Sequence, residues 1–440
     1  MRSAFFCLIL VVFILTACNL PSRFLSPQSL TITPISTLET EAVLLETQPA
    51  HHDAADPGSA DLLLSTPFLE TASPEPPSTL PAALLFLSRQ SGLNQIWRLE
   101  ADGHSLRQIT HEATPVTDFD ISPLDGRLAY VSDNDLILAK ADGSERTLLV
   151  DGPTLPAENN PDFSNQLLGK PRWSPDGESI AYSLGGVNII EASGGVPFQL
   201  ILNENPPQPK DNPAQTAYFF YWPESWSPDG KRLLLGFAAA PSLGGLAVIN
   251  AAGGEPVFIQ NPPPSGISSE MPANTAPVEA VCCNPFWSLD GAAIYYANPF
   301  LGMFSAGLWR ADAASGQSQT LIPSQTKDGL YHMPGFVFQA KNGKLYYFYG
   351  QTDAFPEGDV MLTPVQAEAD ALTGRAPLRS DAWLVGEALW SPDARGVVVL
   401  DLASAAPTEF PPLGKLFYLP FNGNAAIPLP ATGYALHWAR

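Results

Sequence analysis

The chain has 440 residues, a formal net charge of −22 at pH 7 and a hydrophobic fraction of 45%. This length and this fraction are sufficient for one large globular domain. The acidity argues against a nucleic-acid partner, because phosphate recognition needs clustered Lys and Arg, and the sequence has no basic stripe.

Residues 1–18 predict a bacterial lipoprotein signal peptide. Arg2 supplies a short basic start, and residues 5–15 form an apolar stretch that is too short for a comfortable membrane span. The stretch ends in Leu15-Thr16-Ala17-Cys18, which resembles the lipobox, in which the Cys is lipid-modified and becomes the new N-terminus. We therefore expect Cys18 to anchor an extracytoplasmic protein to the bacterial cell membrane. The alternative is an ordinary secretory signal whose small residues merely precede a Cys.

Residues 19–80 predict a disordered tether. Pro, Ser, Thr and Glu dominate, and no periodic apolar pattern runs through the segment. Such a segment cannot bury enough apolar surface to offset the entropy lost on ordering. A flexible chain of this length has a root-mean-square reach of about 40–50 Å. His51-His52 lacks further ligands at metal-binding spacing, so we expect neither a metal nor a cofactor.

A phrase that returns about every 50 residues dominates the rest of the chain. It reads Trp-Ser-Pro-Asp-Gly at residues 173–177 and 226–230, Trp-Ser-Leu-Asp-Gly at 287–291 and Trp-Ser-Pro-Asp at 390–393. Most copies precede a short apolar run, which is typical of a strand. Pro fixes its φ angle, Asp can bond nearby backbone N–H groups and Gly permits positive φ. Each copy therefore predicts a strand, a tight turn and a second strand.

The copies and a second series of turns both count seven. Altered copies lie at residues 119–126 and 336–343, and residues 434–438 match the first strand of the phrase. The second series consists of turns at Gly103, Gly143, Gly195, Gly254, Gly316, Gly374 and Gly423. The repeat region opens near residues 82–87 without a first strand and closes on a first strand alone. If the blades form a ring, the last strand supplies the one that the first blade lacks, and no sheet edge stays unpaired. We therefore predict an all-β, seven-bladed β-propeller over residues 81–440, in which the C-terminal strand completes the first blade.

One Asp and one Trp per blade predict structural roles. With the four strands of a blade named A to D, the phrase forms the A–B turn and the second series forms the C–D turns. The turn carboxylates are Asp176, Asp229, Asp290 and Asp393, and the residues expected to pack between blades are Trp173, Trp226, Trp287 and Trp390. Asp133-Asn134-Asp135 hints at calcium, but it stands where a B–C hairpin turn is needed, so we interpret it as a turn.

The long connections indicate a binding face. D–A and B–C connections emerge at the same end of a four-stranded antiparallel blade, and nearly all long loops are of these two kinds. Long insertions on one face of a repeat protein usually mark its binding face. Candidate contact residues there are the aromatic residues Tyr221, Trp222, Phe300 and Phe355 and the acidic residues Glu204, Asp211, Asp353 and Glu357. The aromatic run at 218–222 could instead pack into an A strand, because propeller sheets are buried on both faces.

Only two cysteines remain in the body of the mature chain, Cys282 and Cys283. The expected compartment is oxidising, so a vicinal disulfide is one interpretation. Adjacent pairing is strained, and two buried thiols entering an A strand are the other.

Signals for catalysis are weak. No Gly-x-Ser-x-Gly elbow occurs, and the four histidines outside the tether, His104, His111, His332 and His437, have no compact ligand spacing. We therefore expect a non-catalytic binding scaffold. The alternative is a hydrolase or lyase that acts on an extracellular polymer at the loop-rich face.

The Trp-Ser-Pro-Asp-Gly phrase, the Ile-Ala-Tyr-like strand after it and the Gly turns together resemble the repeats of TolB-like propeller proteins. The resemblance covers about residues 82–440 and is weaker in the altered copies at Ser122 and Gln339. It implies an extracytoplasmic propeller that binds proteins or peptides, and it transfers no catalytic residue. We expect the propeller to be a monomer. Fold alone does not fix function.

Overall fold

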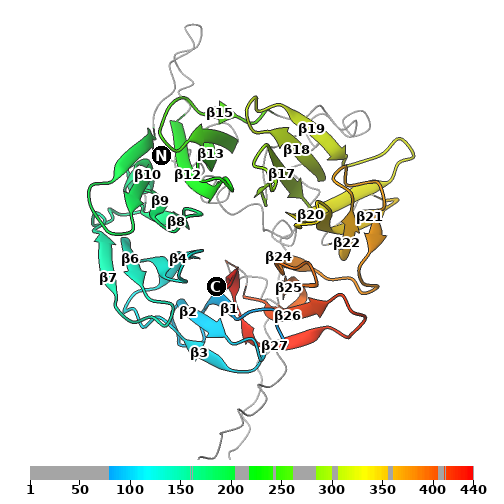
Figure 1. Ribbon diagram of the computed structural model, residues 1–440, viewed down its shortest axis with the longest axis horizontal. Coiled ribbons are helices and arrows are strands. Elements are labelled where there is room, and N and C mark those ends of the chain that lie inside the picture. Colours follow the sequence, from blue (N-terminus) through cyan, green and yellow to red (C-terminus); the bar gives the residue numbers. More distant parts are fainter. Residues whose placement is uncertain are drawn as a thin grey trace, which may run out of the picture. The chain divides into compact units, whose positions relative to one another are not determined.

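The structure is a computed structural model that describes residues 79–158, 160, 162–203, 218–240, 244–260, 284–299, 306–354, 360–404, 411 and 413–439. In these residues seven four-stranded antiparallel sheets follow one another around a ring (Figure 1). The predicted seven-bladed β-propeller is therefore confirmed.

Each blade has its A strand nearest the centre of the ring and its D strand at the outside. Blade 1 contains β28 (Tyr434–Trp438), β1 (Leu84–Ser88), β2 (Gln95–Leu99) and β3 (Leu106–Gln108). Blade 2 contains β4 (Val116–Ile121), β5 (Leu128–Ser132), β6 (Asp135–Ala139) and β7 (Thr147–Val150). Blade 3 contains β8 (Gly169–Trp173), β9 (Ser179–Ser183), β10 (Gly186–Glu191) and β11 (Phe198–Leu202). Blade 4 contains β12 (Tyr218–Trp226), β13 (Arg232–Ala240), β14 (Gly245–Asn250) and β15 (Val257–Phe258).

The remaining three blades complete the ring in the same order. Blade 5 contains β16 (Phe286–Trp287), β17 (Ala293–Asn298), β18 (Gly307–Asp312) and β19 (Ser318–Ile322). Blade 6 contains β20 (Tyr331–Gln339), β21 (Leu345–Thr352), β22 (Thr363–Ala367) and β23 (Ala376–Pro377). Blade 7 contains β24 (Val385–Trp390), β25 (Gly396–Asp401), β26 (Lys415–Pro420) and β27 (Ile427–Thr432).

The C-terminal strand closes the ring, as the phase of the repeats predicts. β28 pairs antiparallel with β1, with Trp438 opposite Leu84 and Tyr434 opposite Leu87. The indole N–H of Trp438 also donates to the carbonyl oxygen of Trp390 in blade 7 at 2.8 Å. The first blade is thus built from both ends of the repeat region, and its inner strand connects it to blade 7.

The hydrophobic core consists of seven clusters, each shared by two neighbouring blades. Successive side chains of a strand project to opposite faces of its sheet. In β13, Leu233 and Leu235 belong to the cluster shared with blade 3, whereas Leu234 belongs to the cluster shared with blade 5. Both faces of the sheet are buried in this way, which explains why strands that follow the repeated phrase carry apolar residues at successive positions.

Four blades carry a residue in the left-handed region at the same place in the repeat. These residues are Lys170, Asn284, Phe336 and Ala435, with φ values of 54°, 45°, 56° and 54°. The register of β8 against β9 shifts between Gly169 and Arg172 at this place. A bulge adds one residue to a strand and changes the side to which the following side chains project. The inner strands therefore do not alternate regularly along their whole length.

The connections between strands contain two short helical elements and one tight turn. A short helix, α2 (Phe163–Gln166), interrupts the connection from blade 2 to blade 3, and a 3-10 turn, η4 (Leu402–Ser404), follows β25; the sequence indicated neither. Asp133 and Asn134 have φ values of 53° and 64° and form the two-residue turn between β5 and β6, the geometry typical of tight hairpins. The Asn134 amide donates to the carbonyl oxygen of Pro153 at 2.8 Å, so this turn also holds the connection to blade 3.

Candidate functional site

The two ends of the ring differ in their connections. In an antiparallel blade the A–B and C–D turns lie at one end, which we name the short-turn end. The B–C and D–A connections lie at the other, the loop-rich end, which includes the long connections from β11 to β12, β15 to β16 and β25 to β26. The N–H groups of Thr79 and Leu80 donate to the carbonyl oxygen of Ala101, in the C–D turn of blade 1, at 2.8 and 2.9 Å. Because β28 also runs towards that end, both ends of the described propeller lie at the short-turn end.

The repeated Ser and Asp residues bond to one another inside the A–B turns. The Ser hydroxyl donates to the Asp carboxylate at 2.5 to 2.7 Å in the pairs Ser174–Asp176, Ser227–Asp229, Ser288–Asp290 and Ser391–Asp393. The Ser174 oxygen in turn accepts the N–H of Ser179, at the start of strand B, at 2.9 Å. The Ser174 hydroxyl and the backbone N–H of Glu178 hold the pKa of Asp176 below its ordinary value. These carboxylates therefore satisfy local donors and form no shared site.

The repeated Trp residues lie between neighbouring blades. The indole N–H of Trp226 donates to the carbonyl oxygen of Arg172 at 2.9 Å, and that of Trp390 to the carbonyl oxygen of Phe336 at 2.7 Å. The rings of Trp173 and Trp287 instead lie under guanidinium groups of the preceding blade, those of Arg127 and Arg232, at 5.1 and 5.3 Å. In each case the Trp side chain contacts the blade before its own.

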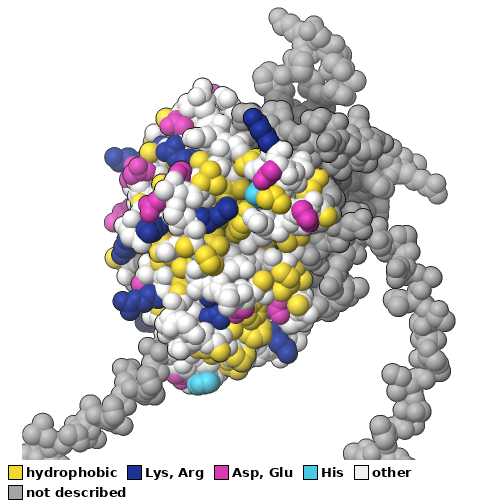
Figure 2. Space-filling model, turned by 90° about the vertical axis from the view of Figure 1, so that its right-hand side faces the viewer, with side chains coloured by type: hydrophobic (Ala, Val, Ile, Leu, Met, Phe, Trp, Pro, Cys, Tyr) yellow, Lys and Arg dark blue, Asp and Glu magenta, His cyan; other side chains and the backbone are white. Residues whose placement is uncertain are grey.

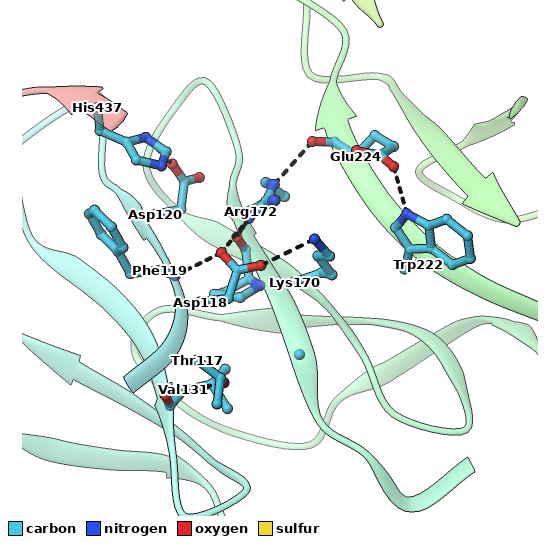
Figure 3. A network of polar contacts seen from close by, with 12 residues as sticks. Thr117, Asp118, Phe119, Asp120, Val131, Lys170, Arg172, Trp222, Glu224 and His437 are labelled. Carbon is cyan, nitrogen blue, oxygen red and sulfur yellow. Dashed lines mark hydrogen bonds and ion pairs between the residues drawn. The ribbon is translucent and has the colours of Figure 1, made fainter. Parts of the chain in front are cut away.

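Ionisable side chains connect the inner strands of five blades. We name this set the polar arc; it consists of Asp118, Asp120, Lys170, Arg172, Glu224, Glu387 and His437. Figure 3 shows its central part, where Arg172 of β8 lies between Asp118 of β4 and Glu224 of β12. The Arg172 guanidinium is 3.4 Å from the Asp118 carboxylate and donates to the carbonyl oxygen of Glu224 at 3.0 Å. One cation therefore bonds to blades 2 and 4 from blade 3.

The ion pairs of the arc determine the charge of Asp118. Burial alone would raise the pKa of Asp118, but the nearby Arg172, Lys170 and His437 hold it below the ordinary value. Lys170 contributes from farther away, with its Nζ 3.7 Å from an Asp118 oxygen. Asp120 accepts the backbone N–H of Trp173 at 2.7 Å, a second bond from blade 2 to blade 3. Both carboxylates of β4 therefore contact blade 3, and Asp118 does so as an ionised group.

At the closing seam the arc holds the C-terminal strand. The Glu387 carboxylate of blade 7 accepts the N–H groups of Ala435 and Leu436 in β28 at 2.8 and 2.7 Å. Burial raises the pKa of Glu387, although these two N–H groups act in the opposite direction. His437 lies with Nδ1 3.6 Å from an Asp120 oxygen in blade 2. The strand is thereby hydrogen-bonded to blade 7 on one side and lies close to blade 2 on the other.

The inner strands of blades 5 and 6 contribute aromatic residues at the matching place. Phe286 and Phe338 stand two residues before the turn, where the arc has Arg172 and His437. Their rings meet edge to face with centroids 5.4 Å apart. Burial holds the pKa of His437 below its ordinary value. The inner strands are therefore polar over blades 7 and 1 to 4 and aromatic over blades 5 and 6.

Of the four aromatic candidates, Tyr221 and Trp222 can be placed. Tyr221 is 6% exposed and packs in the cluster between blades 3 and 4, so it is not available as a surface anchor, and the packing interpretation of this run applies to it. The side chain of Trp222 is half-buried. Its indole N–H donates to the Glu224 carboxylate at 2.5 Å, and a Cβ atom at Gly236 would lie 2.3 Å from its ring. Gly236 thus provides the room in which the indole lies against β13.

The other candidates fall into two groups. Asp353 is exposed just after β21, at the loop-rich end. Outside the described residues lie Phe300, Phe355, Glu204, Asp211, Glu357, Cys18, Cys282 and Cys283. The structure therefore adds nothing to the predictions of lipidation, of a vicinal disulfide and of most loop contacts.

Sequence reasoning did not find the polar arc. Three of its members occupy the same repeat position, the last residue but one of the inner strand. They are Asp120, Arg172 and His437. Aligning the seven copies would have shown charge there in three successive blades, where a regular A strand is apolar. The sequence therefore contained a sign of the arc. It did not show which of these side chains contact one another, because the partners lie in blades about 50 residues apart.

Within the described part of the chain, no three His, Cys, Asp or Glu residues gather as a metal site would need. In the same residues no helix has the length and apolar character required to span a bilayer. Figure 2 shows the rim over the blades on the right of Figure 1, where acidic, basic and hydrophobic side chains intermingle. Among the described residues of this face, no patch of one sign stands out for phosphate.

No protein-family model and no curated protein sequence matches the chain. Among solved structures it is similar to a putative TolB from Agrobacterium tumefaciens, with 16% identity, 69% of this chain and 89% of that chain covered and a TM-score of 0.37. It is also similar to TolB from Acinetobacter baumannii, with 13% identity, 67% and 63% covered and a TM-score of 0.39. A puromycin hydrolase gives 11% identity, 81% and 53% covered and a TM-score of 0.53, so the chain spans about half of that protein. Identities this low show the propeller fold alone.

Proposed function

We propose that the protein is a lipid-anchored, extracytoplasmic propeller that binds a protein or peptide partner, without catalysis, at its loop-rich end. One observation carries the proposal. Both ends of the described propeller, at Thr79 and Trp438, lie at the short-turn end. The predicted tether therefore joins the end opposite to the long connections, which leaves those connections free for a partner.

The described residues towards the loop-rich end suit a partner with aromatic and basic groups. Trp222 is held by Glu224 and Gly236, so little conformational entropy is lost when a partner packs on it. Asp353 adds an exposed carboxylate, and the whole chain is strongly acidic. Acidic surfaces speed the association of cationic partners in a salt-dependent way. We infer that Glu204, Asp211 and Glu357 act with Asp353, and that Phe300 and Phe355 serve as further anchors.

The partner can be sought with the mature chain as bait in solubilised cell envelope. Hydrogen exchange with and without the captured partner should then show protection at the D–A and B–C connections. Trp222→Ala should weaken binding by about 1–3 kcal/mol if it is a contact centre. Leu289→Ser, at an exposed residue of an A–B turn, is the matched control and should leave binding unchanged. Protection confined to the short-turn end would refute the proposal.

The anchor has its own test. Mass spectrometry of the protein isolated from membranes should show acylated Cys18 at the N-terminus, and Cys18→Ser should abolish both acylation and release of residues 1–17. A mature protein that begins elsewhere, or carries no lipid, would refute the anchoring but not the binding face.

A further inference from the structure

His332 is a buried titratable group at the loop-rich end, on the connection from blade 5 to blade 6. It is the second residue of β20 and is 7% exposed. The segment before it folds back on itself: Gln325 pairs with Tyr331, and the N–H of His332 donates to the carbonyl oxygen of Ser324 at 2.8 Å. The imidazole is therefore held in place by the backbone around it.

Both ring nitrogens of His332 contact a hydroxyl group, and each hydroxyl has a second partner. Nδ1 is 2.5 Å from the Tyr349 hydroxyl, which donates to the Gln351 side-chain oxygen at 3.0 Å. Nε2 is 3.1 Å from the Thr326 hydroxyl, which donates to the Asp328 carboxylate. The four contacts form one chain from an exposed amide on β21, through the imidazole, to a carboxylate in the preceding connection.

The number of protons along this chain of hydrogen bonds determines which protonation state of the His332 ring fits it. A hydroxyl group has a single proton to donate. With the Tyr349 proton directed at Gln351 and the Thr326 proton directed at Asp328, both oxygens can only accept from the ring. Both ring nitrogens must then carry a proton, which is the imidazolium form. In the neutral form one of the outer bonds must reverse.

Burial, more than the surrounding charges, favours the neutral form of His332. Burial lowers the pKa of His332, and Arg375 lowers it further, whereas Asp328 raises it. The Arg375 guanidinium lies 4.1 Å from the centroid of the Tyr349 ring, which itself stacks on the His332 ring. Among the described residues, these two are the charged groups that act on the imidazole. The chain of bonds therefore changes direction as the pH falls.

The bond that reverses can be identified from its chemistry. Asp328 is a carboxylate and can only accept, so reversing the Thr326 bond would leave it without this donor. Gln351 is an exposed amide, and rotation of its side chain presents an N–H group to Tyr349 in place of the oxygen. The neutral chain then runs from Gln351 N–H to Tyr349, from Tyr349 to Nδ1, and from Nε2–H through Thr326 to Asp328.

We propose that His332 Nδ1 is the proton acceptor of a relay whose protonation reverses the Tyr349–Gln351 hydrogen bond at the loop-rich end. Protonation adds one proton at Nδ1, turns the Tyr349 hydroxyl towards Gln351 and rotates the Gln351 amide, while the Asp328 side of the chain keeps its bonds. A fall in pH thus rotates the exposed amide of Gln351, two residues before Asp353. Towards Tyr349 this amide changes from hydrogen-bond donor to acceptor. It requires no partner, so its test is independent of the proposed function.

The first test reads the tautomer directly. The mature chain, labelled with ¹⁵N and ¹³C in histidine, is titrated by NMR. His332 is identified by elimination, with each of the other five histidines replaced by Gln in turn. We expect the neutral ring to carry its proton on Nε2, and the acid form to carry protons on both nitrogens. A neutral ring protonated on Nδ1 would overturn the proposal.

The second test changes the acceptor at the far end of the chain. Gln351→Glu leaves only acceptor oxygens there, so Tyr349 must donate to it and Nδ1 must hold a proton. The titration midpoint of His332 should rise by about one pH unit. Thr352→Glu is the matched control, because it places the same charge on the next residue, whose side chain projects to the other face of β21. Equal shifts in the two variants, or none in Gln351→Glu, would show that the hydrogen-bond chain does not control the proton.

Discussion

Arg172 and Lys170 provide a sharp test of the polar arc, because the two cations lie on one strand and share one partner. The Arg172 side chain is 19% exposed and the Asp118 side chain 17%, whereas the Lys170 side chain is 41% exposed. Removing one partner of a largely buried ion pair leaves an uncompensated charge, which costs about 3 kcal/mol or more. Exposed pairs are worth about 1 kcal/mol or less. Arg172→Met should therefore lower the unfolding free energy by about 3 kcal/mol, and Lys170→Met by less than about 1 kcal/mol.

The pH dependence of these two variants distinguishes charge from lost packing. In the wild-type chain the pKa of Asp118 lies below its ordinary value, so ionised Asp118 contributes stability that is lost as the pH falls through that lowered pKa. Without Arg172, burial dominates and raises the pKa of Asp118, so the folded variant takes up a proton more readily than the unfolded chain. Its stability deficit should therefore shrink between pH 7 and pH 5, while the deficit of Lys170→Met stays small.

Urea unfolding of the mature chain at the two pH values measures both deficits. The double variant Asp118→Asn/Arg172→Met serves as the control, because it removes both charges and should cost less than the sum of the single changes. Equal costs for the two cation variants, or a deficit of Arg172→Met that does not change with pH, would refute the role of the arc as a charged connection between blades.

The closing strand, the Trp222 site and the cysteine pair can each be tested separately. Deletion of residues 434–440 removes β28, leaves β1 with an open edge and leaves Glu387 without two N–H partners, so the melting temperature should fall sharply; an unchanged value would contradict closure by this strand. Gly236→Ala places a Cβ atom 2.3 Å from the Trp222 ring and should displace that indole, weakening partner binding as much as Trp222→Ala does, whereas equal binding to wild type would show that Trp222 is not a contact. Mass spectrometry of the unreduced peptide that contains Cys282 and Cys283 should show the loss of two hydrogens if they are bonded, and alkylation of both thiols would decide for the other interpretation.

The sequence predicted the turns and the ring because both depend on short stretches of chain. The Ser174 hydroxyl, the Asp176 carboxylate and the N–H of Ser179 lie within six residues, so the phrase itself contains the atoms that form the turn. The number of blades follows from counting phrases. Closure by residues 434–438 follows from the phase of the two ends, since a first blade without strand A and a last strand without a blade complete each other.

The inner strands could not be interpreted in the same way, because a bulge breaks their alternation. Tyr221 and Trp226 are five residues apart and would project to opposite faces of a regular strand. The register of β12 shifts between Pro223 and Ser225, and both side chains pack between blades 3 and 4. The shift places Tyr221 in the core and leaves Trp222 beside Glu224. Pro223 is the one local sign of this bulge, because a proline inside a strand is confined to edges, strand starts and bulges. In four other blades the left-handed residue at this place is Lys170, Asn284, Phe336 or Ala435, so no glycine marks it.

The two ends of the propeller thus differ in how their hydrogen bonds are satisfied. At the short-turn end each Ser–Asp pair bonds to the turn that contains it, so neighbouring blades impose little on it and the same phrase recurs. At the loop-rich end several bonds join a turn or strand to a connection 17 to 19 residues away in the sequence. Asn134 holds the connection to blade 3, and His332 joins Thr326 to Tyr349. A substitution there changes the contacts of a connection. The short-turn end also has bonds between blades, since Arg232 donates to the carbonyl oxygen of Gly291 at 2.8 Å. The place of the two propeller ends, and not the pattern of bonds, is therefore the reason for which we propose the partner at the loop-rich end.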